Sequence, residues 1–179
     1  MTYREPQPKK PLTESQRTAL QQTLQREWQG LQLLTEQAEL KPYECDALAA
    51  FTQIPLAVVL PKNEAEVQQI LQTCLRLNIP VVARGAGTGL TASSMPTPDG
   101  VLVAMSRFNR ILNIDPEART ATVQPGVRNL AVSEAAAPHG LFYAPDPSSQ
   151  LACSIGGNVS QNSGGLHWLK YGLTTHNVL

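Results

Sequence analysis

The fold of this chain is decided by residues 80–94, PVVARGAGTGLTASS. An apolar run typical of a strand leads directly into three glycines at alternate positions, Gly85, Gly87 and Gly89. Glycine is used where a chain needs a positive φ or where another group must approach the backbone closely. The pattern therefore predicts a strand followed by a loop that lies against another group, and a phosphate is one candidate.

The glycine loop matches neither of two familiar nucleotide-binding motifs. The third glycine of a Rossmann G-x-G-x-x-G fingerprint would fall on Leu90, and the following residues contain two prolines instead of a helix. A Walker loop needs a lysine, but none lies between Lys62 and Lys170. Successive backbone N–H groups can still form an anion-binding nest, with hydroxyl donors such as Thr88 beside it. An ordinary glycine-rich turn explains the loop equally well at this point.

A second unusual segment is YAPDPSSQLACSIGGNVSQNSGG, residues 143–165, whose only charged residue is Asp146. Uncharged, glycine-rich backbone indicates a segment that packs around a large or polyanionic ligand with its amides as donors. The alternative is an ordered surface loop, although loops of this length without secondary structure are usually functional.

The remaining pattern predicts an α+β fold. A capping box formed by Thr13 and Gln16 opens a helix, and a second capping pair, Asn63 and Glu66, opens an amphipathic helix that ends at Asn78. Strands are expected at 56–60, 79–84, 100–105, 111–115 and 120–124, the first two parallel and the last two a hairpin. A short helix ends with Gly140 at its C′ position. Residues 30–51 are expected to be irregular, and the last forty residues to hold almost no regular pattern.

Composition excludes several classes of function. The formal net charge is zero, so no overall field favours nucleic acid or an anionic membrane. The longest apolar run is far too short to span a bilayer, and no secretory signal is expected after the polar start, MTYREPQPKKP. The three cysteines form no CxxC pair, which favours reduced thiols in a cytoplasmic protein and no metal or iron–sulfur site on this chain.

Four ordered motifs carry a resemblance to a known family: PVVARGAGTGL, VQPGV, APDPSSQLACSIGGNVSQNSGG and KYGLTTHNVL. Together they resemble the FAD-binding domain of the vanillyl-alcohol oxidase/p-cresol methylhydroxylase flavoproteins, from about residue 40 onward. The resemblance implies a two-lobed α+β domain of the p-cresol methylhydroxylase type, C-terminally incomplete. Its first lobe would cover residues 41–95 and the start of its second lobe 96–179, preceded by a tail and helix at 1–40.

The resemblance also implies a cofactor site for FAD. The loop after the second strand would wrap the diphosphate, and the later segment would line the cofactor toward the flavin ring. The implied cofactor-binding residues are Gly85, Ala86, Gly87, Thr88, Gly89, Asp146, Ser148, Ser149, Gly156, Gly157, Asn162 and Gly164. Some relatives attach FAD through a histidine near the glycine loop; this chain has none there, so we expect non-covalent FAD.

Within the family, the motifs are most like those of flavoproteins that oxidise glycolate or a similar D-2-hydroxy acid to the 2-oxo acid. The groups that bind such a substrate lie in a later domain, so no residue here is assigned as catalytic and we expect the 179 residues alone to be inactive. Expected partners are a small 2-hydroxy acid in the full-length protein and other oxidase subunits, including an iron–sulfur subunit that would allow membrane association. A truncated, non-catalytic nucleotide-binding or protein-interaction module is the alternative.

Overall fold

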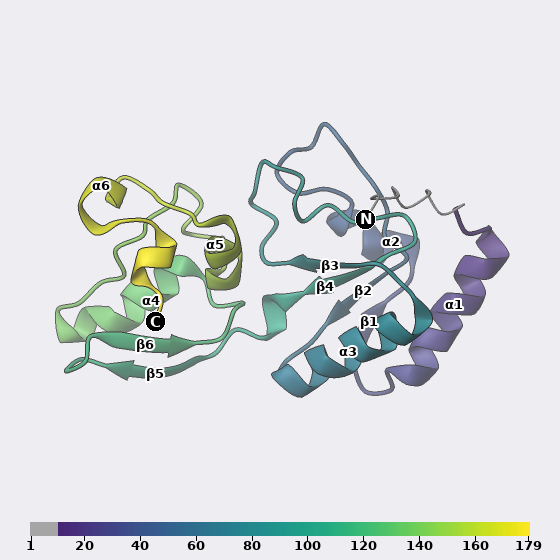
Figure 1. Ribbon diagram of the computed structural model, residues 1–179, viewed down its shortest axis with the longest axis horizontal. Coiled ribbons are helices and arrows are strands. Elements are labelled where there is room, and N and C mark those ends of the chain that lie inside the picture. The colour runs from purple at the N-terminus through teal and green to yellow at the C-terminus, as the bar shows by residue number, and fades with distance from the viewer. Residues whose placement is uncertain (1–10) are drawn as a thin grey trace, which may run out of the picture.

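The computed structural model describes residues 11–179, which form two lobes lying side by side (Figure 1). The first lobe holds a four-stranded sheet with helices on it, and the second holds a β-hairpin, one longer helix and several short ones. This mixture of elements confirms the predicted α+β class. Residues 1–10, where most of the predicted N-terminal tail falls, lie outside the described residues.

The sheet of the first lobe does not follow chain order. Its strands are arranged as β1 (Gln32–Leu34), β2 (Ala57–Leu60), β4 (Val101–Ala104) and β3 (Val81–Arg84). Strand β4 pairs in parallel with both β2 and β3, whereas β1 is antiparallel to β2. The predicted parallel orientation of β2 and β3 is therefore confirmed, but β4 lies between them.

Two helices of the first lobe begin as the sequence predicts. Helix α1 (Glu14–Glu27) starts with the complete capping box of Thr13 and Gln16. Helix α3 (Glu64–Leu77) starts at Asn63, whose side chain accepts the N–H of Glu66, and ends at Asn78 with a φ of 54°. The second pair, Asn63 and Glu66, differs from a complete capping box in one hydrogen bond. The Glu66 carboxylate accepts the N–H of Lys62, at 2.7 Å, in place of the N–H of Asn63.

The core of the first lobe lies on both faces of the sheet. Leu24 and Trp28 from the α1 region and Ile70 from α3 pack on one face, and Leu40 at the end of α2 (Gln37–Leu40) packs on the other. All residues of β2 and β4 are buried, as expected for parallel strands covered on both sides. Helix α1 and strand β1 also contribute to this core. The domain boundary proposed at residue 40 stays a prediction.

The expectation of irregular structure across residues 30–51 is wrong for β1, α2 and the short 3₁₀ helix Lys41–Tyr43. These elements contain three or four residues each, too few to show a hydrophobic period. Strand β1 forms because its backbone completes the hydrogen bonding of β2, which is a tertiary effect.

The second lobe begins after the 3₁₀ helix Met105–Arg107 and not at residue 96 as predicted, because β4 belongs to the sheet of the first lobe. The hairpin of β5 (Ile111–Asp115) and β6 (Thr120–Val123) confirms the prediction, as does α4 (Asn129–Ala136), whose 3₁₀ extension Ala137–His139 ends at Gly140 with a φ of 69°. No helix within residues 11–179 has the length and apolar character that a membrane crossing requires.

The last forty residues contain more helix than the sequence predicts. They form α5 (Ile155–Gln161), α6 (Trp168–Tyr171) and the 3₁₀ helix Thr174–Asn177. Helix α5 begins because the Ser154 side chain accepts the N–H of Gly157 at 3.3 Å, and it ends at Asn162 with a φ of 49°. Two glycines in its first turn hide this helix from a propensity analysis.

Candidate functional site

A groove of about 600 Å³ opens where β3 ends and the two lobes meet. The structure brings the two sequence-predicted segments together along its walls. From the predicted site it is lined by Gly85, Ala86, Gly87, Thr88, Gly89, Ser149, Gly156 and Gly157. Ser93, Ser94, Asn158 and Ser160 add polar groups to the same walls.

The glycine loop is shaped as an anion-binding nest. Gly87 has a φ of 71°, in the left-handed region that favours glycine. Within residues 11–179, the backbone N–H groups of residues 86–89 donate no hydrogen bond to protein. Backbone donors left without partners at the wall of a groove are suited to binding phosphate oxygens.

The loop lies directly against the N-terminus of α5. A Cβ added at Gly85 would collide with the Ser154 Oγ and would lie 3.7 Å from the Cα of Gly157. Alternate glycines are therefore required here for two different reasons: Gly85 for close packing between the lobes and Gly87 for its backbone conformation. Gly89 has no other residue's atoms within 4 Å of an added Cβ, so the space beside it is open.

The motif VQPGV, residues 123–127, holds the start of α5 in place within the second lobe. The Gly156 N–H donates to the Pro125 carbonyl at 2.8 Å, and the Ile155 N–H donates to the Val127 carbonyl at 2.8 Å. A Cβ at Gly126 would collide with the Met105 carbonyl. The start of α5 is thereby fixed to the backbone that follows β6.

A buried amide pair, which the sequence analysis missed as a unit, supports the second segment from behind. The Asn129 side chain donates to the Pro145 carbonyl at 2.9 Å and accepts from the Asn158 side chain at 2.8 Å. Both asparagines are at most 2% exposed. Two asparagines in small-residue segments give no periodic signal, so only the structure shows that they pair.

The other predicted site residues do not line the groove. Asp146 accepts the backbone N–H of His167 at 3.1 Å, and one of its carboxylate oxygens lies 2.7 Å from the His167 Nδ1. Burial acts to raise the pKa of Asp146, but the hydrogen bonds from His167 and its charge outweigh burial and lower that pKa below its ordinary value. The pair anchors the chain between α5 and α6.

Ser148 is exposed outside the groove, and Gly164 lies against Leu173 and Trp168. Asn162 ends α5, and its side-chain carbonyl accepts the Thr175 N–H at 3.1 Å. These residues are placed to hold the second segment in shape.

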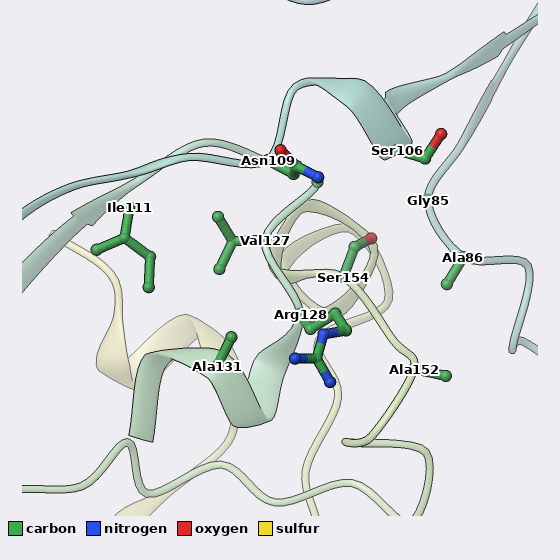
Figure 2. A pocket seen from close by; sticks show the side chains of 11 residues that line it. Gly85, Ala86, Ser106, Asn109, Ile111, Val127, Arg128, Ala131, Ala152 and Ser154 are labelled. Atoms are coloured by element: carbon green, nitrogen blue, oxygen red, sulfur yellow. The ribbon is translucent and has the colours of Figure 1, made fainter. Parts of the chain in front are cut away.

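A second cavity of about 430 Å³ adjoins the groove (Figure 2). It shares Gly85, Ala86 and Ser154 with the groove, and Asn109 and Arg128 from the second lobe complete its polar wall. An elongated ligand that contacted both hollows would cross the glycine loop where its amides lack protein partners.

A protein family described as an FAD binding domain matches residues 55–179. The chain belongs to this family. The family assignment confirms the predicted cofactor, FAD. The prediction that the four motifs belong to an FAD-binding domain is also confirmed.

Relatives of this FAD-binding domain include the glycolate oxidase subunit GlcD of Escherichia coli (strain K12). It is 56% identical over 168 residues, which are 94% of this chain and 34% of the relative. The D-2-hydroxyglutarate dehydrogenase of Xanthomonas citri pv. viticola is 36% identical over 152 residues, 85% of this chain and 32% of the relative. The chain thus spans about a third of these relatives.

Among solved structures, p-cresol methylhydroxylase with substrate bound matches with a TM-score of 0.66 and 22% identity. The match covers 85% of this chain and 30% of that protein. At this identity the likeness concerns the fold alone, and it confirms the predicted p-cresol methylhydroxylase type of FAD-binding fold.

Proposed function

We propose that this chain is the FAD-binding part of a flavin-dependent oxidoreductase that oxidises glycolate or a similar D-2-hydroxy acid to the 2-oxo acid. The observation that carries the proposal is the groove, whose walls combine the unpartnered amides of residues 86–89 with the N-terminus of α5. The substrate class is supported by the two relatives described above, which act on 2-hydroxy acids by name.

The residues of the groove fit a dinucleotide. Gly85, Ala86, Gly87, Thr88 and Gly89 would hold the diphosphate of FAD, and Ser149, Gly156 and Gly157 would follow the cofactor toward the flavin. Asp146, Ser148, Asn162 and Gly164 would act by holding the second segment in the shape that the cofactor needs. Bound FAD supplies the hydride-accepting chemistry, and the protein supplies binding, orientation and electrostatics.

We infer that FAD is held without a covalent bond to histidine. His139, His167 and His176 are all outside the residues that line the groove. His167 already pairs with Asp146, and the His176 ring accepts the Leu173 N–H at 3.1 Å. Denaturation of the flavin-loaded protein should therefore release all FAD into the supernatant.

The remaining parts of the proposal concern the whole protein. The 2-hydroxy acid would be its small-molecule substrate, and other oxidase subunits, among them an iron–sulfur subunit, would receive the electrons on the cytoplasmic side. The word subunit in the name of the Escherichia coli relative supports an assembly of several chains. No residue of this chain is assigned to proton transfer.

Titration with FAD tests the cofactor site directly. We expect the 179-residue chain to quench FAD fluorescence with saturation, and ADP to compete because it carries the same diphosphate. Gly87→Val should abolish saturable binding while far-UV circular dichroism stays nearly unchanged. No saturable binding by the wild-type chain would overturn the cofactor site. In the whole protein, glycolate without an added acceptor should bleach the visible flavin absorbance, whereas failure of all 2-hydroxy acids to do so would overturn the activity.

A further inference from the structure

One arginine beside the glycine loop carries a charge that no carboxylate among the described residues neutralises by contact. Arg84 is the last residue of β3 and is only 8% exposed. No carboxylate oxygen within residues 11–179 lies within 4.0 Å of its guanidinium. Burying a charge is unfavourable unless it is paired, so this position needs an explanation.

The protein satisfies the guanidinium only in part. Its Nη1 donates to the Cys45 carbonyl at 2.7 Å, and its Cζ lies 5.7 Å from the centre of the Tyr43 ring. Its Nε and Nη2 donate no hydrogen bond to the part of the chain that the structure describes. Burial lowers the pKa of Arg84, and the fields of Cys45, Asp46 and Tyr43 act in the opposite direction.

Asp46 does not complete an ion pair with Arg84. Its Oδ1 accepts the Leu48 N–H at 2.9 Å, and its Oδ2 is buried without a hydrogen-bond partner within residues 11–179. The segment that contains it is instead bound to the glycine loop, because the Ala47 N–H donates to the Gly89 carbonyl at 3.1 Å.

The free side of the guanidinium lies at the glycine loop. A Cβ at Gly87 would lie 2.9 Å from the Arg84 Nε and closer still to the Arg84 Cζ and Nη2. Arg84 also lines the groove together with residues 85–89. A planar cation with unused donors therefore lies beside the nest of unpartnered amides, and both are suited to the same anion.

We propose that Arg84 is the counter-charge of the cofactor diphosphate: its guanidinium supports the glycine loop at Gly87 and attracts the phosphate groups that the loop amides bind. This inference rests on the proposed FAD site and adds a positioning residue to it. Backbone amides alone would bind a phosphate by geometry, whereas Arg84 makes the site respond to the charge of its ligand.

The test compares Arg84→Met, which keeps most of the length and removes the charge, with Arg84→Lys, which keeps the charge without the planar donors. Arg76→Met is the matched control, since Arg76 is an exposed arginine of α3 that pairs with Glu27 at 2.8 Å and does not line the groove. FAD and ADP are titrated into each variant at several salt concentrations.

We expect Arg84→Met to weaken both FAD and ADP by about tenfold or more, as for loss of a hydrogen bond to a charged group. Arg84→Lys should fall between Arg84→Met and wild type, and Arg76→Met should match wild type within about twofold. The loss of affinity with added salt should be shallower for Arg84→Met, because one cation has left the site.

Thermal unfolding without ligand separates this role from a structural one. Removal of an unpaired buried charge should leave the melting temperature of the free protein equal or higher, while the increase caused by FAD shrinks. If wild type binds FAD and Arg84→Met binds it within twofold, the role of Arg84 is refuted although the cofactor site stands. If Arg84→Met does not fold, Arg84→Lys decides: in a variant of wild-type stability, complete loss of saturable FAD binding would refute the charge role, because the charge is still present.

Discussion

Replacing Gly87 by alanine tests the conformation of the cofactor loop. With a φ of 71°, Gly87 lies where other L-residues are disfavoured by about 1–2 kcal/mol. The new Cβ would also lie 2.9 Å from the Arg84 Nε, so the guanidinium must shift and its bond to the Cys45 carbonyl weakens. A weakened hydrogen bond adds about 1 kcal/mol, which gives a total loss of about 2–3 kcal/mol in the free energy of unfolding.

In a chain of this size, 1 kcal/mol corresponds to a change of about 2–4 °C in melting temperature, so Gly87→Ala should lower it by roughly 4–12 °C. Gly89→Ala is the matched control, because Gly89 has no positive φ and open space at its Cβ position. Its free energy of unfolding should change by less than about 0.5 kcal/mol. Thermal unfolding followed by circular dichroism measures both variants.

A double-mutant cycle divides the Gly87→Ala loss into its two causes. In an Arg84→Met background the contact with the guanidinium is gone, and Gly87→Ala should cost only the conformational part, about 1–2 kcal/mol. Equal melting temperatures for Gly87→Ala and Gly89→Ala would refute the reasoning about φ. An unchanged loss in the Arg84→Met background would refute the contribution of the contact.

Three further predictions concern other parts of the molecule. The pKa of Asp146 is lowered in the folded state, so its stabilising contribution is complete above its ordinary value of about 3.9 and is lost as the pH falls through the folded value. Asp146→Asn should therefore melt below wild type at pH 6, with the difference vanishing in acid; a constant difference would contradict the linkage. Burial raises the pKa of the Cys74 thiol to about 11, so a thiol reagent at neutral pH should modify the partly exposed Cys45 and reach Cys74 only after unfolding, as peptide mass mapping would show. Asn129→Ala leaves the buried Asn158 amide and Pro145 carbonyl unpaired and should reduce the free energy of unfolding by about 2–4 kcal/mol, as measured in denaturant titrations. Asn113→Ala, at an exposed position, should have little effect. Equal losses in the two variants would show that the amide pair adds no stability.

Local signals predicted the long elements of the fold. Neighbouring residues determine the apolar stripe and caps of α3, the capping box of α1 and the turn between β5 and β6. Strand β1 escaped because three residues carry no period, and the position of β4 between β2 and β3 depends on pairing between distant segments. Such pairing is decided by the assembled sheet, so no local pattern contains it.

The candidate site shows a similar division. Alternate glycines predicted that residues 85–89 lie close to another group, and these residues line the groove. Gly85 and Gly87 answer local demands for space and φ, whereas the contact with the FAD diphosphate stays a prediction. Arg84 escaped because a charged residue at the end of an apolar strand is ordinarily exposed. The family resemblance implied a cofactor role for Asp146, Asn162 and Gly164, but a shared motif does not tell which side chains face a groove and which fix the backbone.

The interleaved sheet has a consequence for the order in which the chain assembles. Strands β2 and β3 are not hydrogen-bonded to each other, because β4 lies between them in the sheet (Figure 1). The sheet is complete only when residues 101–104 pair with both β2 and β3, which closes residues 85–100 into a loop. Joining the ends of that loop has an entropic cost that β4 offsets by pairing on both sides at once. The cofactor loop lies in this connection between β3 and β4, so its shape is set in the same folding step that completes the sheet of the first lobe. Variants that slow this closure should slow refolding of the whole lobe, even where they leave the finished groove intact.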